Sequence, residues 1–223
     1  MQIPEALKKG DTIAIATTAR YVLAQEIQAA IKTIETNGFK AQLSETIYAQ
    51  ENQFGGSDYE RIAGLQHLLD NPEIKAIWFA RGGYGTARIV DSLDFGQLVK
   101  SPKWLIGFSD LTVLLNHVYQ QYSIVTLHAP MAMQADSNHI LYNQNDIADC
   151  FKIITGNAVN YPLPSHSLSK PGNCEGILVG GNLSVLCSVI GTESFPDTKG
   201  KILFLEDLDE YLYHIDRMVL NLK

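Results

Sequence analysis

Short apolar runs alternate along the chain with segments whose apolar residues recur at helical spacing. The runs predict buried strands, because strands covered on both faces carry few polar positions. The segments between them predict helices that bury one face, and Ser57-Asp-Tyr-Glu60 has the capping-box pattern that starts such a helix. Strands are expected at 12–16, 39–43, 75–80, 104–106 and 124–127, and helices at 22–36, 58–69, 86–93, 111–120 and 148–154.

This alternation predicts βαβ units and a mostly parallel sheet of the flavodoxin or Rossmann type. We place this N-terminal α/β domain at residues 1–157 and a linker rich in proline and serine at 158–173. Residues 174–223 predict a smaller, incomplete α/β domain. Its expected elements are a strand, a helix, a strand and a helix at 176–179, 182–190, 202–205 and 211–222.

Composition narrows the function classes. The net charge of −7 argues against a general nucleic-acid binder, because neutralising phosphates needs an excess of Lys and Arg. Neither a signal peptide nor a membrane-spanning apolar stretch is expected, so we predict a cytoplasmic protein without a membrane partner. Cys150, Cys174 and Cys187 form no Cys-x-x-Cys pair, so we expect buried thiols rather than disulfides or a zinc site.

The most distinctive local pattern is a serine between a predicted strand and a predicted helix. Gly107-Phe-Ser109-Asp110 follows the apolar run at 104–106. A sharp strand-to-helix turn of this kind exposes a nucleophilic hydroxyl, and the backbone N–H of Asp110 can then face a developing oxyanion. The alternative is that Ser109 or Asp110 only caps the helix.

A glycine-rich turn, Arg81-Gly82-Gly83-Tyr84-Gly85, follows another predicted strand. Glycines allow backbone N–H groups to approach an anion closely. The turn lacks the third glycine of a dinucleotide-binding loop and does not follow the first strand. Because the carboxyl ends of parallel strands share one edge of a sheet, we expect this turn to meet Ser109. The alternative is a flexible turn.

An acidic cluster follows the strand expected at 202–205. Glu206 comes directly after it, where a carboxylate is held rigidly enough to orient a catalytic histidine. For Asp207, Asp209 and Glu210 we favour a solvated acidic start of the next helix. Of the histidines, His128 is expected to line a pocket, and none has metal-ligand spacing.

Seven motifs in this order resemble the serine LD-carboxypeptidase family over essentially the whole chain. They include the serine turn, the glycine turn and Glu206-Asp207, and the others are Lys9–Ile15, Phe54–Asp58, His128–Met131 and Gly180–Leu183, with Asp216–Met218 supporting the acidic motif.

The resemblance implies an active site between two domains. Ser109 would be the nucleophile and Glu206 the acid of its triad. The N–H groups of Asp110 and of Gly83 would form the oxyanion hole, and Arg81, Gly82 and Tyr84 would bind substrate. It further implies release of the terminal D-alanine from a cytosolic murein tetrapeptide during peptidoglycan recycling, with no metal or other cofactor, by a homodimer.

Two departures from the family qualify this expectation. Ala16-Thr17-Thr18 stands where the family usually has Ala-Pro-Ser, and the family's catalytic histidine lies in a C-terminal segment that this chain lacks. His214 follows Glu206 closely and lacks the family's Gly-His context. We therefore expect this chain to be inactive or very weak. The alternatives are a catalytically dead peptide-binding homologue, a peptidase that inactivates microcin C, and a nucleotide-binding protein that uses the glycine turn.

Overall fold

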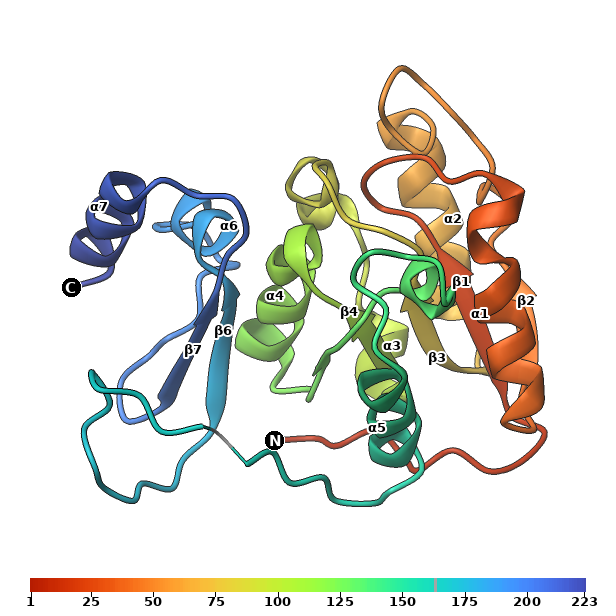
Figure 1. The fold of residues 1–223 in the computed structure, drawn as a ribbon. Coiled ribbons are helices and arrows are strands. Elements are labelled where there is room, and N and C mark those ends of the chain that lie inside the picture. Colours follow the sequence, from red (N-terminus) through yellow and green to blue (C-terminus); the bar gives the residue numbers. More distant parts are fainter. Residues whose placement is uncertain (163) are drawn as a thin grey trace.

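A five-stranded parallel sheet forms the centre of the computed structural model, which describes residues 1–162 and 164–223 (Figure 1). Its strand order is β2-β1-β3-β4-β5, so the chain adds strands on one side of β1 and then on the other. This order confirms the predicted parallel-sheet α/β class. The strands are β1 (Thr12–Ala16), β2 (Lys40–Leu43), β3 (Ile74–Phe79), β4 (Trp104–Gly107) and β5 (Leu127–His128).

Helices cover both faces of this sheet, which explains why its central strands are mostly apolar. Ile13 and Ile15 of β1 pack with α1 (Ala24–Thr36) and α5 (Gln144–Ile154). Ala14 and Ala16 face the opposite cluster, with α2 (Asp58–Asp70), α3 (Gly96–Lys100) and α4 (Thr112–Tyr122). The alternation follows from the two-residue period of a strand.

The start of α2 confirms the predicted capping box. The Ser57 hydroxyl accepts from the Glu60 backbone N–H at 3.3 Å, and Glu60 accepts from the Ser57 backbone N–H at 2.8 Å. Both interactions satisfy donors that the first turn of a helix leaves unpaired. They fix the residue at which α2 begins.

Two predicted elements differ from the structure. Residues 86–93 form two 3₁₀ turns, η1 (Thr86–Arg88) and η2 (Val90–Ser92), rather than one helix, and the Thr86 N–H donates to the Asp110 side chain of another segment. The fifth strand begins at Leu127 instead of Ile124, since Ile124 pairs with Gln2 at the N-terminus. Local pattern contains neither of these distant partners.

A second, two-stranded parallel sheet is built from β6 (Leu178–Asn182) and β7 (Ile202–Glu206). It carries α6 (Leu183–Ser188) and α7 (Leu212–Leu222), and Figure 1 shows this group beside α4. Several hydrogen bonds join the group to α4; two of them reach β6, where Asn116 Nδ2 donates to Gly180 O at 2.8 Å and Asn182 N donates to Thr112 Oγ1 at 3.0 Å. The position of β7 relative to β4 therefore depends on α4.

The connection from α5 to β6 contains the predicted linker, of which residue 163 lies outside the described residues. Elsewhere in 158–173 the described backbone forms no helix or strand. The domain boundaries themselves stay a prediction. No helix in the described part of the chain has the length and apolar character needed to cross a membrane.

The expectation of three buried thiols is wrong for one cysteine. Cys150 is buried and Cys187 is partly buried, but Cys174 is exposed. Cys174 lies in the extended segment before β6, where no helix or sheet covers it.

Candidate active site

Ser109 occupies a strained turn directly after β4. Its φ is +61°, a left-handed conformation that residues with a side chain seldom adopt. It opens a 3₁₀ turn, η3 (Ser109–Leu111), that leads into α4. Neither Ser109 nor Asp110 makes a capping hydrogen bond at the start of η3 or α4, so helix capping does not account for this serine. Strain of this kind is common at functional sites.

The glycine turn after β3 lies directly against Ser109. A Cβ built on Gly82 would stand 3.1 Å from Ser109 Oγ and 3.2 Å from Ser109 Cβ, closer than an ordinary contact. The neighbouring Gly83 has a φ of +115°, which also favours glycine. Glycine at these positions lets the backbone that follows β3 approach the Ser109 hydroxyl, which follows β4.

Buried polar groups hold this glycine turn in place. Asp110 Oδ2 accepts from the Thr86 N–H at 2.9 Å, and the hydroxyls of Thr86 and Thr18 lie 2.8 Å apart. From α2, Arg61 Nη1 donates to Gly85 O at 2.9 Å and also to Thr18 O. The ends of β1, β3 and β4 are thus tied together. The roles of Arg61 and of the Asp110 carboxylate were missed, because their partners are remote in sequence.

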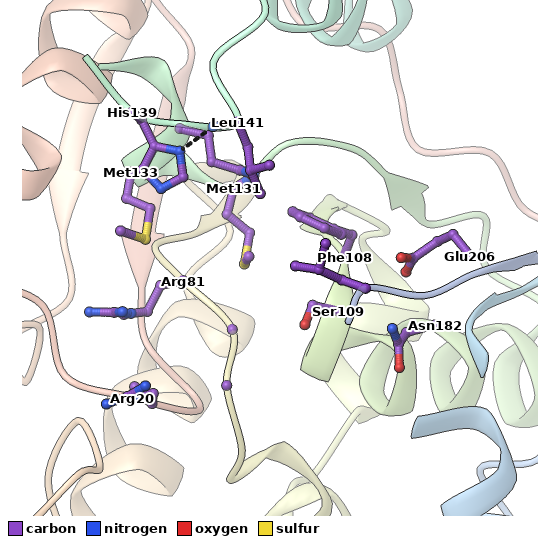
Figure 2. A pocket seen from close by; sticks show the side chains of 14 residues that line it. Arg20, Arg81, Phe108, Ser109, Met131, Met133, His139, Leu141, Asn182 and Glu206 are labelled. Atoms are coloured by element: carbon purple, nitrogen blue, oxygen red, sulfur yellow. Dashed lines mark hydrogen bonds between the residues drawn. The ribbon is translucent and has the colours of Figure 1, made fainter. Parts of the chain in front are cut away.

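Glu206 ends β7 and lines the same cavity, of about 220 Å³, as Ser109, Gly82 and Gly83 (Figure 2). Its Oε1 is buried and has no hydrogen-bond partner among the described residues. Burial raises the pKa of the Glu206 carboxyl, and the nearby charge of Asp207 raises that pKa further. An unpaired acceptor in this position is suited to receive a donor that enters the cavity.

Asp207 differs from the expected solvated helix start. Its carboxylate accepts from the Ser184 N–H at 2.9 Å and from Asn182 Nδ2 at 3.1 Å. Asp207 therefore stabilises the beginning of α6 rather than that of α7. Asn182 is paired with Glu206 across the two strands, which places it at the same edge of the cavity.

Two histidines lie near the cavity. His139 lines it, and its Nδ1 accepts from the Leu141 N–H at 3.1 Å. His128 lines adjoining cavities, as expected, with its ring centroid 4.9 Å from that of Phe204. Burial lowers the pKa of the His128 imidazole to about 4, so its ring is neutral near pH 7.

His214 pairs with Glu210 of its own segment, Nδ1 to Oε2 at 2.9 Å. Within residues 1–162 and 164–223, no imidazole hydrogen-bonds to Ser109 or Glu206. The described residues also contain no group of three or more His, Cys, Asp or Glu side chains that could hold a metal ion. Metal-free chemistry stays a prediction.

The three residues predicted to bind substrate have different surroundings. Gly82 and Arg81 line the cavity, and Arg81 Nη1 donates to Tyr21 O at 3.2 Å. Tyr84 is half exposed, lies 6.1 Å from the Phe54 ring and is not among the residues lining this cavity. Arg20, which follows β1, does line it, although no local pattern had indicated this residue.

This arrangement has several of the parts needed for acyl transfer, although no imidazole among the described residues hydrogen-bonds to Ser109. The partly buried Ser109 hydroxyl stands beside the Gly82–Gly83 turn, whose backbone N–H groups can stabilise an oxyanion, and a carboxylate from the second sheet lines the same cavity. Met131, Met133 and Leu141 provide an apolar wall (Figure 2). The space between them can exclude water from a bound peptide.

Comparison with known families matches both parts of the chain. Residues 12–129 match the model of the LD-carboxypeptidase N-terminal domain, and residues 175–223 match that of the LD-carboxypeptidase C-terminal domain. A relative from Bacillus subtilis strain 168, named as a probable murein peptide carboxypeptidase, is 37% identical over 225 residues. That match covers 99% of this chain and 69% of the relative.

Two crystal structures resemble the whole fold. A muramoyltetrapeptide carboxypeptidase from Oxalobacter formigenes is 31% identical with a TM-score of 0.84, and the match covers 95% of this chain and 70% of that one. An MccF-like protein from Bacillus anthracis strain Ames is 25% identical with a TM-score of 0.87, over 100% of this chain and 76% of that one.

Proposed function

Because the chain belongs to the LD-carboxypeptidase family, we propose that its cavity binds the C-terminal end of a murein tetrapeptide, with Ser109 positioned to cut the L,D bond that releases D-alanine. The observation that carries this proposal is the meeting of strained Ser109, the Gly82–Gly83 backbone and Glu206 at one cavity. A carboxypeptidase-type function follows from the family, and the substrate and the residue roles are the proposal.

The reaction would proceed through an acyl-enzyme. Ser109 Oγ attacks the carbonyl carbon, and a base removes the hydroxyl proton. The negative charge that develops on the carbonyl oxygen is stabilised by the N–H groups of Gly83 and Asp110. The C–N bond then breaks, the amine of D-alanine takes a proton and leaves, and water hydrolyses the ester to restore Ser109.

Glu206 would orient the base. In a serine triad the acid accepts a hydrogen bond from an imidazole and stabilises the imidazolium ion that forms. The unpaired, buried Oε1 of Glu206 is available for that bond. The described residues place no imidazole between Glu206 and Ser109, so we propose that this 223-residue chain turns over very slowly. Without the base, a residual acceleration of roughly 10³–10⁴ over water is expected.

The biological setting belongs to the same proposal. We propose that the protein acts in peptidoglycan recycling in the cytoplasm and that it is a homodimer. Both proposals come from its resemblance to the family. A catalytically dead peptide-binding homologue is the alternative, and the absence of a hydrogen-bond partner for Glu206 Oε1 among the described residues is compatible with both.

The test combines binding and turnover on the purified chain. Calorimetry with murein tetrapeptide is expected to show binding, while chromatography for free D-alanine shows almost none. Ser109→Ala should leave affinity within about twofold of the wild-type value, because it removes only a hydroxyl. Robust D-alanine release that Ser109→Ala abolishes would contradict slow turnover. Absence of tetrapeptide binding would contradict the substrate itself.

A further inference from the structure

Two arginines give one side of the cavity a positive charge. Among the described residues that line it, Arg20 and Arg81 are the ones with a permanent cation, and Glu206 lies toward the opposite end (Figure 2). Arg20 comes from the turn after β1 and Arg81 from the turn after β3. The sheet topology brings them together, because β1 and β3 are neighbours.

The charge of Arg81 is already partly neutralised. Its Nη1 lies 3.5 Å from Glu26 Oε1 and donates to Tyr21 O. Arg20, by contrast, forms no ion pair with any described carboxylate. An unpaired guanidinium at the mouth of a cavity favours an anionic ligand, and its planar fork suits a carboxylate.

The stem of Arg20 is held against the glycine turn. Its backbone N–H donates to Gly82 O at 3.4 Å, and a Cβ built on Gly83 would stand 2.5 Å from Arg20 Cγ and Cδ. Gly83 therefore leaves room for this side chain as well as for an approaching oxyanion. The Arg20 stem therefore lies against the same Gly82–Gly83 backbone that contacts Ser109.

Ser109 and the stem of Arg20 contact neighbouring glycines of this turn, and both side chains line the same cavity. Ser109 lies against Gly82 and Arg20 lies against Gly83, and consecutive Cα atoms are about 3.8 Å apart. In a peptide cut at its last bond, the terminal carboxylate is one residue away from the carbonyl that Ser109 attacks. Because Arg20 and Ser109 line one cavity, a peptide that occupies this cavity is within reach of both side chains.

We infer that Arg20 binds the terminal carboxylate of the peptide and so restricts the site to the last bond of a chain. The assignment rests on the proposed carboxypeptidase function and deepens it. Arg81 holds the Arg20 loop through Tyr21 O while Glu26 offsets its charge. An internal peptide bond or an amidated terminus offers Arg20 no anionic partner, so the site discriminates through the charge of the guanidinium that is left without a counter-ion.

The experiment compares a free and a blocked terminus. Murein tetrapeptide and the same peptide ending in a carboxamide are titrated calorimetrically into the Ser109→Ala protein, so that no peptide is consumed. We expect the free carboxylate to bind roughly tenfold or more tightly than the amide. Adding Arg20→Gln should remove this difference, and Arg20→Lys should keep a smaller one, because ammonium retains the charge without the fork.

Arg217→Gln on exposed α7 is the matched control, and it should leave the carboxylate preference unchanged. Thermal melts check that each variant is folded. If Arg20→Gln keeps the full preference, or if the parent protein binds both peptides equally well, the Arg20 assignment is wrong while the proposed substrate stands. If neither peptide binds the parent protein, the proposed function fails and the assignment fails with it.

Discussion

Ser109 combines a left-handed backbone with a side chain, a conformation that costs about 1–2 kcal/mol for any residue other than glycine. The surrounding contacts must supply that free energy. Gly82 lies against the serine and Asp110 anchors the turn after it, so the conformation is imposed by packing. A serine needed only to start a helix would have no reason to be strained.

Replacement by glycine should relieve this strain. We expect Ser109→Gly to be about 1 kcal/mol more stable to unfolding than Ser109→Ala, because both lose the hydroxyl but only alanine keeps a Cβ at positive φ. Urea unfolding followed by circular dichroism measures the difference. At the exposed linker position Ser165, the same pair should not favour glycine. Equal stability of the two Ser109 variants would mean that the turn is unstrained.

Glu206 carries a stability cost when ionised. Its pKa is raised by burial and then by Asp207, so the folded protein binds its proton more readily than the unfolded chain does. Stability is therefore lost as pH rises from the unfolded value, near 4.5, through the higher folded value. Below that window both states are protonated and the cost disappears.

Glu206→Gln should therefore make the protein more stable at pH 7, because the neutral amide removes the cost of the buried charge. The gain should vanish near pH 3, and any turnover should be lost. Denaturant unfolding across pH measures this, with Glu5→Gln on the exposed N-terminal segment as the control. A destabilised Glu206→Gln at pH 7 would show that the carboxylate is better paired than its surroundings indicate.

At the scale of elements, the site depends on three strand ends held in register. The turn after β3 is fixed to the turn after β4 by Asp110 and Thr86, and to α2 by Arg61. A buried network of this kind is stabilising only while each member keeps its partner.

Asp110→Ala should destabilise the protein by about 1–3 kcal/mol, because the buried Thr86 N–H loses its acceptor. It should also loosen the glycine turn and weaken peptide binding. Asp110→Asn retains an acceptor oxygen and is expected to lose less than half as much. Chemical denaturation and calorimetry of both variants provide the comparison. Equal losses in the two would point to the charge of Asp110 rather than to its hydrogen bond.

At the scale of the molecule, α4 sets the distance between the two halves of the site. Its residues Thr112 and Asn116 hydrogen-bond to β6, and β6 pairs with the strand that ends at Glu206. The C-terminal group also leaves apolar side chains uncovered. On α7, Leu212 is 85% exposed and Leu220 is 62% exposed. Such a surface is typical of a protein interface.

We expect the chain to form the predicted homodimer and α7 to contribute to its interface. Leu212→Glu should weaken association at least tenfold in sedimentation analysis, since a buried charge opposes the contact. The thermal stability of the dilute chain should change little, because Leu212 has few contacts to lose. Asn221→Glu, an already polar and exposed position on α7, is the control. A monomer at all concentrations, or a dimer that tolerates Leu212→Glu, would contradict this assignment.

The family and the parallel-sheet fold were predictable because their signals are local. The run at 12–16 became β1 at the same residues, and the capping box placed α2. The recognised motifs lie at strand ends, and the family matches confirm the resemblance. The functional roles of Ser109 and Glu206 stay predictions, although the structure places both at one cavity.

By itself the sequence determined most of the strands, where glycine must stand and which chemistry is available at Ser109. Only the tertiary structure decided that Arg20 shares the cavity, that Asp110 accepts from Thr86, that Glu206 Oε1 has no partner among the described residues and that Asp207 stabilises the start of α6. The reason is physical. Periodicity and turn preferences act over a few residues, whereas these contacts join segments brought together only when the sheet forms and buries its faces.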